Sequence, residues 1–304
     1  MPSLKDECTK YLRETRLSHN VDPSGKRWLL IPGHKPLPAH DPSKVRSHGV
    51  SHKAEFYEQS TTLLLSFLLN RFKPHTFLDI GSADGYFARV AASNTTAAPV
   101  AHAFDMRPET VAQLQRASAG LDLPGKVVGH LAGLSDTHAG NRDIWFARTK
   151  MFEYEPKPHE YQEAWYRRLK FFLRGNRSRG LHKASVLLTS IDHFCESSNA
   201  APGLIKCDVD GYEGQVLKGA QHRMSAADKP LILLELHRDR MQRGGYTRRT
   251  VARQVFDAGY KALFLTDHHE ATKCDFIPAG PDHELFDRQE TDMVLFVPEA
   301  KWEA

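Results

Sequence analysis

Apolar residues along the chain occur in short continuous runs, separated by segments in which they recur at helical spacing. The runs predict strands at residues 76–80, 100–104, 126–130, 204–207, 230–236, 261–265 and 292–297. Helical patterns follow four of these runs, at residues 86–93, 108–119, 212–223 and 247–258. Such alternation is typical of an α/β fold, with a mostly parallel sheet and helices on both faces. Only a polar loop joins the last two strands, which predicts an antiparallel final strand.

Two segments depart from this alternation. Residues 1–50 begin with a charged helical pattern and then carry five prolines, which disfavour a long regular element. We expect them to form an N-terminal extension that wraps a single domain of residues 51–304. Within that domain, residues 146–188 form a long excursion between two core strands, which is uncommon unless the segment has a function. From Trp165 to Lys183 the excursion carries seven Lys or Arg, several aromatic residues and no acid.

Composition is that of a soluble globular protein. The chain has 304 residues, 40% hydrophobic and 26% charged, which suffices for one sizeable core. Its four cysteines stand far apart, its first twenty residues are highly charged, and the longest apolar run, 63–69, is too short to cross a bilayer. We therefore expect a cytoplasmic protein with reduced thiols and no membrane span. The formal charge of +4 permits an anionic partner without requiring one.

A turn containing two glycines joins the first predicted strand to the helix that follows it. Asp79 lies near the end of the strand, Gly81 and Gly85 frame the turn, and Tyr86 opens the helix. Glycines let the backbone approach a ligand, and ligands of open α/β sheets lie past the carboxyl ends of the strands. The turn lacks the G-x-G-x-x-G spacing of dinucleotide enzymes. Its acids, Asp79 and Asp84, instead suit a ligand with a cationic amino-acid end, such as S-adenosylmethionine.

A further acidic residue supports this interpretation. Asp105 closes the second predicted strand, 26 positions after Asp79. An acid at the end of that strand holds ribose hydroxyls in many nucleoside-binding α/β proteins. Together the glycine turn and Asp105 predict a methyltransferase that uses S-adenosylmethionine, whereas a chance glycine turn or a surface Asp would explain either one alone.

Two longer segments resemble a known family. Residues 205–220 read I-K-C-D-V-D-G-Y-E-G-Q-V-L-K-G-A, and the apolar strand at 230–237 ends in Glu235 and His237. With the glycine turn and the V-V-G-H-L-A-G-L-S-D stretch at 127–136, they look like the FkbM-type methyltransferase family. Two positions depart from the family pattern. Asp210 stands where the family usually has Glu, which shortens the reach of the carboxylate, and Ala83 replaces a glycine of the turn, which we expect to cost little.

The resemblance implies a Rossmann-like class I methyltransferase fold, usually seven-stranded, that uses S-adenosylmethionine. It also implies methyl transfer to a hydroxyl of a sugar, a glycan or another small metabolite. Residues that match the family's cofactor positions fall into three groups. Those expected at the methionine end are Asp79, Gly81, Ser82, Asp84, Gly85 and Tyr86; those expected at the ribose and adenine are Asp105 and Met106; and those expected near the adenine are Ser135 and Asp136.

A hydroxyl acceptor must also lose its proton. Either a base removes the proton, or a bound metal ion lowers the pKa of the hydroxyl group. Asp208 and Asp210 follow the fourth predicted strand, and Glu235 and His237 end the fifth. In our preferred, metal-free hypothesis His237 or Asp208 is the general base and Asp210 assists. In the alternative, Asp208, Glu235 and His237 hold a divalent metal ion, for which oxygen and imidazole ligands are suitable. Asp210 or Glu213 would equally serve as a cap of the next helix.

The acceptor is the least determined part of the prediction. The segment 146–188 is read as an amphipathic helix packed on the domain, as a substrate lid that favours an anionic acceptor, or as a nucleic-acid surface. The modest total charge and the lack of a recognisable RNA-binding motif argue against nucleic acid. Alternatives to a small-molecule enzyme are therefore a nucleic-acid methyltransferase and a non-catalytic binding module. His52, Glu55 and Tyr57 either close over the cofactor or form an ordinary helix face.

Overall fold

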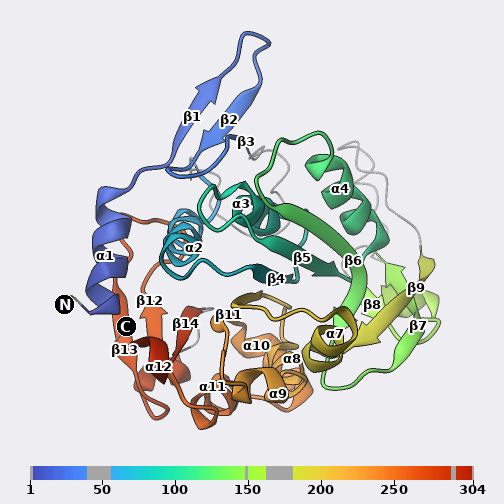
Figure 1. Cartoon of the computed structure of the whole chain (residues 1–304). Coiled ribbons are helices and arrows are strands. Elements are labelled where there is room, and N and C mark those ends of the chain that lie inside the picture. Colours follow the sequence, from blue (N-terminus) through green and yellow to red (C-terminus); the bar gives the residue numbers. More distant parts are fainter. Residues whose placement is uncertain (1–2, 40–55, 148–149, 162–180, 289–291, 303–304) are drawn as a thin grey trace.

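One large mixed sheet runs through the part of the chain that this computed structural model describes, residues 3–39, 56–147, 150–161, 181–288 and 292–302 (Figure 1). Within these ranges the sheet has eleven strands. In their order across the sheet they are β13 (Phe276–Ala279), β12 (Tyr260–Leu265), β14 (Asp292–Pro298), β11 (Leu231–Leu236), β10 (Leu204–Cys207), β4 (Thr76–Ile80), β5 (Val100–Asp105), β6 (Lys126–Leu134), β9 (His182–Thr189), β7 (Gly140–Ala147) and β8 (Lys150–Phe152).

All seven predicted strands form, and they lie next to one another from β12 to β6. Strands β11, β10, β4, β5 and β6 are parallel to one another, and β14 runs antiparallel between β11 and β12, as predicted. The remaining four strands extend the two edges, and most of their pairings are antiparallel, so the whole sheet is mixed. Strands β7 and β9 escaped prediction because the first half of β7 is polar and mostly exposed, and β9 largely alternates between buried and more exposed residues.

Helices cover both faces of the sheet (Figure 1). On one face, α2 (Gln59–Phe72) and α3 (Tyr86–Ser93) pack over residues such as Phe77, Leu204 and Leu233, and α4 (Pro108–Ser118) adds Leu114. The other face meets α7 (Ile191–Ser198), α8 (Glu213–Lys218) and α11 (Arg248–Asp257). The shorter described helices are α5 (Pro158–Tyr161), α9 (Gln221–Ser225), α10 (Arg238–Met241), η2 (Gln242–Gly244), η3 (Glu284–Asp287) and α12 (Glu299–Trp302).

The helix predicted at 212–223 is broken into α8 and α9 at Gly219. A Cβ at Gly219 would overlap the backbone oxygen of Ser135, so this position brings the helix end against the loop after β6. None of the described helices is long and apolar enough to cross a membrane. The four cysteines all lie in described ranges and are free thiols.

The first 39 residues form a helix and a small sheet. Helix α1 (Leu4–Glu14) starts at a capping box made by Ser3 and Asp6 and contacts α2 and β13. Strands β1 (Ser18–Val21), β2 (Arg27–Leu30) and β3 (Leu37–Pro38) then form an antiparallel sheet whose hairpin projects from the molecule (Figure 1). Residues 40–55, which include His52 and Glu55, lie outside the described ranges.

The segment predicted as an insertion, 146–188, begins and ends in strands of the large sheet. Its first residues complete β7 and form β8, and its last residues belong to β9, which pairs with both β6 and β7. Residues 162–180, which carry Trp165 and most of the basic side chains, lie outside the description. The described ends place the segment at the β6 edge of the sheet.

Candidate active site

The glycine turn closes over the carboxyl ends of the central strands. The amides of Gly81 and Ser82 both donate to the backbone oxygen of Phe104 on β5, at 3.0 Å. Gly81 has a φ of 77°, and a Cβ there would overlap the backbone oxygen of Asp208, just past the end of β10. Only glycine satisfies both conditions, because a side chain would strain the backbone and collide with Asp208. The turn and the end of β10 are therefore in direct contact.

Asp79 is buried beneath this turn with one oxygen unused. Its Oδ2 accepts a hydrogen bond from the amide of Ala88 on α3 at 2.9 Å, whereas its Oδ1 has no partner among the described residues. Burial raises the pKa of Asp79 to about 6, although the charge of Lys206 opposes the shift. The hydroxyl of Ser82 is likewise buried without a described partner. A free carboxylate oxygen and a free hydroxyl beside a glycine turn fit the amino-acid end of S-adenosylmethionine.

Asp105 and Met106 follow β5, next to the turn. The Oδ1 of Asp105 accepts from the amide of Arg107 at 2.7 Å, and burial raises its pKa to about 6. The Met106 sulfur lies against Gly133 of β6, where an added Cβ would come within 2.8 Å of it. Both residues therefore lie at the carboxyl edge of the sheet, and their binding of ribose and adenine stays a prediction.

Several of the predicted cofactor residues are engaged with protein groups. The Tyr86 hydroxyl lies 3.1 Å from the Thr62 hydroxyl of α2, and Asp84 pairs with Arg89 at 3.8 Å. Ser135 donates to Asp136 at 3.3 Å, and a second carboxylate oxygen of Asp136 pairs with Lys218 of α8 at 2.9 Å. These side chains fix the shape of the turn and of the loop after β6.

One expectation about the turn was wrong. Ala83 has a φ of 46°, in the left-handed region where a Cβ is strained. The exchange of glycine for alanine therefore does have a cost, of about 1 kcal/mol or more in backbone energy. Asp210, the other departure from the family pattern, is also left-handed with a φ of 55°.

Three polar residues interrupt the same apolar face of the central strands. Each lies two residues after an apolar residue that packs against α2: Asp79 after Phe77, Lys206 after Leu204, and Glu235 after Leu233. Since side chains alternate along a strand, all three project toward α2 and α3 at the carboxyl edge. Asp79 and Lys206 are register partners on β4 and β10.

Lys206 is buried at the carboxyl edge of the sheet, with 2% of its side chain exposed. Its ammonium lies 3.1 Å from Asp208 Oδ2 and 4.6 Å from the centre of the Phe87 ring. Burial opposes the charged form, but the carboxylates of Asp208 and its neighbours prevail and raise the pKa of Lys206 above its ordinary value. The same ammonium, with His237, lowers the pKa of Asp208 against the effect of burial.

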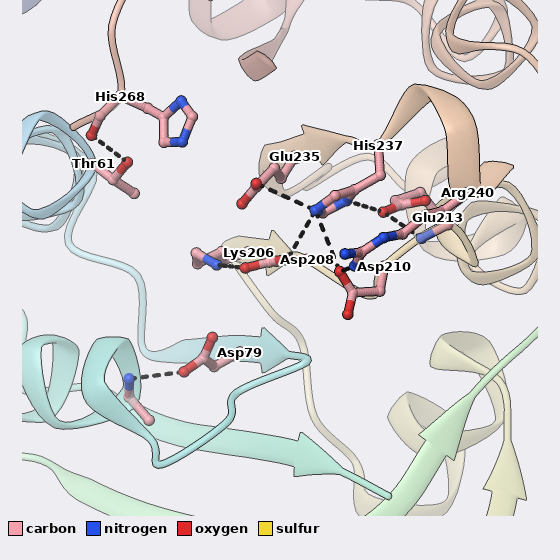
Figure 2. Close-up of polar contacts among 12 residues, drawn as sticks. Thr61, Asp79, Lys206, Asp208, Asp210, Glu213, Glu235, His237, Arg240 and His268 are labelled. Carbon is pink, nitrogen blue, oxygen red and sulfur yellow. Dashed lines mark hydrogen bonds and ion pairs between the residues drawn. The ribbon is translucent and has the colours of Figure 1, made fainter. Parts of the chain in front are cut away.

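His237 occupies the centre of a ring of carboxylates (Figure 2). Its Nδ1 lies 2.7 Å from Oε1 of Glu213, and its Nε2 lies 3.3 Å from Glu235, 3.6 Å from Asp210 and 3.7 Å from Asp208. Burial would lower the pKa of His237, but hydrogen bonds to Glu213 and Glu235 outweigh it and raise the pKa to about 10. In this arrangement the imidazole is cationic at neutral pH.

The carboxylates around His237 range from the fully buried Glu213 to the exposed Asp210. Glu213 is fully buried and accepts the amide of Gly211 at 3.1 Å, so its carboxylate is held in place beneath the imidazole. Asp210 is 60% exposed and forms an ion pair with Arg240 of α10. The atoms of Asp208, Glu235 and His237 that could bind a metal ion all lie within 4.8 Å of one another.

The sequence profile of the methyltransferase FkbM domain matches residues 79–273, well over half of the chain, and so takes in the glycine turn and every member of this ring. The chain belongs to the FkbM methyltransferase family. This methyltransferase is therefore an S-adenosylmethionine-dependent enzyme, as the turn and Asp105 predicted. A search of curated protein sequences gives no match to the chain.

Solved structures of other methyltransferases are distantly similar. A putative O-methyltransferase from Klebsiella pneumoniae has a TM-score of 0.40 at 12% identity, covering 86% of this chain and 84% of its own. The O-methyltransferase from Bacillus cereus in complex with SAH has a TM-score of 0.37 at 10% identity, covering 84% of each chain. Aeropyrum pernix fibrillarin with bound S-adenosyl-L-methionine has a TM-score of 0.35 at 10% identity, covering 93% and 100%. Such values are too low to assign this chain a fold or an activity.

Sequence reasoning missed one acidic residue of this FkbM methyltransferase. Glu58 precedes α2, is 7% exposed, and caps no amide with its side chain. Its Oε2 has no partner in the described structure, and burial, together with the charges of Glu235 and Asp208, raises its pKa. An acid at the start of a helix usually serves as a cap, so nothing in the sequence pattern distinguishes Glu58 from an ordinary capping residue.

The start of α2 is held in place by the loop between β12 and β13. The amide and the hydroxyl of Thr61 both donate to the backbone oxygen of His268, at 3.3 and 3.2 Å, and the amide of Gln59 donates to His269 at 2.9 Å (Figure 2). Tyr57 packs its ring edge-on against Tyr86, with centroids 5.1 Å apart. Residues from three separate parts of the chain thus meet at the start of α2.

Proposed function

We propose that this FkbM methyltransferase transfers the methyl group of S-adenosylmethionine to a hydroxyl oxygen of a sugar, a glycan or another small metabolite. One observation carries the proposal: the carboxylate and imidazole ring around His237 lies directly against the glycine turn, through the contact of Gly81 with Asp208. A hydroxyl acceptor needs both a methyl donor in line with its oxygen and a group that receives its proton. The ring places such groups beside the predicted donor site.

The donor side of the proposal assigns roles to residues around the turn. Asp79 and Ser82 present free polar atoms to the amino-acid end, and Gly81 and Gly85 let the backbone approach the ligand. Asp105 accepts hydrogen bonds from the ribose hydroxyls, and Met106 lies beside the adenine. Ser135 and Asp136 form the other side of the adenine site. Asp84 and Tyr86 stabilise the turn through Arg89 and Thr62. When bound, the cofactor supplies an electrophilic methyl group on a positively charged sulfur.

The acceptor side favours a carboxylate as the proton acceptor. A His237 that is already protonated, with a pKa of about 10, cannot take a second proton, so its role is to orient and balance the acids around it. Glu235 has its pKa raised by burial and by the charge of Asp208, which suits a group that must hold a proton near neutral pH. Asp208, held by Lys206, orients the hydroxyl, and Asp210 contacts the acceptor from the exposed rim.

The charge of the site bears on the choice of acceptor. The described residues around His237 are predominantly acidic, and a phosphate-rich acceptor would be repelled there. A neutral hydroxyl compound therefore fits better than nucleic acid or the anionic acceptor that the basic segment suggested. A non-catalytic binding module would not need a ring of acids against the donor site.

Label transfer from S-adenosylmethionine tests the proposal. The purified enzyme is incubated with methyl-labelled cofactor and a panel of sugars, polyols, phenols, amines and oligonucleotides, and the methylated atom is located by NMR. We expect label on a hydroxyl oxygen, and Glu235→Gln should lower kcat by 100-fold or more while S-adenosylhomocysteine still binds. Label found only on nitrogen, or only on oligonucleotides, would overturn the proposal.

A further inference from the structure

We infer that Asp208, Glu235 and His237 bind one divalent cation, Mg²⁺ or Mn²⁺, at the carboxyl edge of the sheet. The site deepens the proposed function and rests on it for its chemical role, because the cation would face the acceptor hydroxyl. Cation binding itself is independent of any acceptor. Metal-free proton transfer was our preferred hypothesis from the sequence, and the arrangement of the ligand atoms changes that preference.

The three candidate ligands converge from the ends of two neighbouring strands. Their ligand atoms lie within 4.8 Å of one another, and Nε2 of His237 is 3.3 Å from Glu235 Oε1 and 3.7 Å from Asp208 Oδ1. Adjacent ligands of an octahedral ion with bonds of about 2.1 Å are about 3 Å apart. The observed separations therefore need only a small contraction around an ion. Two carboxylates and one imidazole suit Mn²⁺ or Mg²⁺ better than a soft metal ion.

Glu213 prepares His237 for this role. The fully buried carboxylate of Glu213 lies 2.7 Å from Nδ1, so in the neutral tautomer Nδ1–H donates to it and the Nε2 lone pair points at Asp208 and Glu235. Metal-binding histidines usually donate their second ring N–H to a carboxylate or carbonyl in this way. Glu213 itself is fixed by the amide of Gly211 at 3.1 Å. The imidazole is thus oriented before a ligand arrives.

An independent observation comes from the start of α2. Glu58 precedes α2, 150 positions before Asp208 in the chain, and it makes no cap with its side chain. It is more than nine-tenths buried, its Oε2 has no partner among the described residues, and its carboxylate lies within electrostatic reach of Lys206, Glu235 and Asp208. A buried carboxylate with an unused oxygen close to two further acids is costly unless cations compensate it.

The balance of charge leads to the same conclusion. Five carboxylates meet here, those of Glu58, Asp208, Asp210, Glu213 and Glu235, whereas the described cations are Lys206, His237 and Arg240. A divalent ion that replaced the proton on Nε2 would reduce the excess of negative charge in this group from two to one and would be attracted strongly at low local dielectric. Such an ion would lower the pKa of an acceptor hydroxyl bound to it and leave Glu235 or a water molecule to remove the proton.

Mn²⁺ binding to the full chain tests the inference. The enzyme is stripped with a chelator, dialysed and titrated with MnCl₂ while free Mn²⁺ is followed by its EPR signal. We expect one site per chain that Mg²⁺ competes for, and a loss of affinity of 10-fold to 100-fold or more in Asp208→Asn and Glu235→Gln. Glu58→Gln should weaken binding less, by about 10-fold. Asp143→Asn removes an exposed acid that pairs with Lys183 and serves as the control without effect.

Binding of S-adenosylhomocysteine, measured on the same samples, shows whether each variant still folds and keeps its donor site. Absence of saturable Mn²⁺ binding by the wild type up to millimolar concentration would overturn the inference, and so would equal affinity in the wild type and the two ligand variants. Full hydroxyl methylation by the stripped enzyme would exclude a role of the metal ion in the reaction and leave the proposed function intact. Specific Mn²⁺ binding by an enzyme that methylates no hydroxyl compound of the panel would support the site and contradict the proposed function.

Discussion

Lys206 Nζ lies 3.1 Å from Asp208 Oδ2 in a setting where only 2% of the lysine side chain is exposed. Lys206 lies on β10 and Asp208 follows the end of that strand, and Lys206 is also the register partner of Asp79 on β4. One ammonium therefore lies between the donor site under the glycine turn and the carboxylate ring around His237. Lys206 is the buried cation next to these acids, so their ionisation depends on it.

Replacement of Lys206 should destabilise the enzyme in a pH-dependent way. Lys206→Met leaves buried carboxylates without their cation, and loss of one partner of a buried pair typically costs about 3–5 kcal/mol. Without the ammonium the pKa values of these acids rise in the folded state, so the loss in unfolding free energy should be smallest near pH 5 and grow as the pH rises and the acids ionise. Urea denaturation at several pH values measures this.

Lys183→Met is the matched control for that series, because Lys183 makes an exposed ion pair with Asp143 at 3.0 Å. Exposed pairs contribute about 0–1 kcal/mol, so its stability should stay close to the wild type at every pH. A Lys206→Met variant that loses the same small amount at all pH values would contradict the electrostatic role given to Lys206.

Affinity for S-adenosylhomocysteine should depend on the ionisation of Asp79. Its folded-state pKa of about 6 lies above the ordinary value of 3.8, so below pH 6 the carboxyl is neutral and cannot pair with the ligand's ammonium group. Affinity should fall by up to about 10-fold per pH unit below pH 6 and reach a plateau above it. Asp79→Asn should bind weakly at all pH values and lose this part of the slope. Isothermal titration calorimetry between pH 5 and 8 makes the comparison, and an unchanged slope in the variant would exclude Asp79 as its source.

The sequence predicted the centre of this fold well and its edges poorly. Strands such as Leu204–Cys207 and Leu231–Leu236 are buried on both faces and read as continuous apolar runs, whereas half-exposed β7 and β9 give no such signal. The acids Asp208, Asp210 and Glu235 were predicted because they lie at or just past the ends of recognisable strands. Glu58 could not be predicted, because its place depends on how α2 lies over the sheet, and that contact joins residues far apart in the chain.

Ala83→Gly should stabilise the enzyme. Ala83 has a φ of 46°, and removal of its Cβ relieves about 1–2 kcal/mol of strain, partly offset by the greater freedom of glycine in the unfolded chain. We expect a net gain of about 0.5–1 kcal/mol in unfolding free energy, with cofactor affinity within twofold of the wild type. Ala112→Gly, in ordinary helical backbone of α4, should instead lose about 1 kcal/mol. Equal losses in the two variants would show that Ala83 is not strained.

Gly81→Ala should uncouple the donor site from the carboxylate ring. Gly81 combines a φ of 77° with a position where a Cβ overlaps the backbone oxygen of Asp208, so the variant suffers both backbone strain and a displacement of the turn or of the end of β10. Gly25→Ala separates the two effects, because Gly25 has a φ of 82° and open space around it. We expect Gly25→Ala to lose only about 1–2 kcal/mol of stability and to keep full affinity for S-adenosylhomocysteine. Gly81→Ala should lose more stability and at least 10-fold in affinity, as measured by calorimetry and urea denaturation. Equal behaviour of the two variants would mean that the contact between Gly81 and Asp208 does not hold the turn in place.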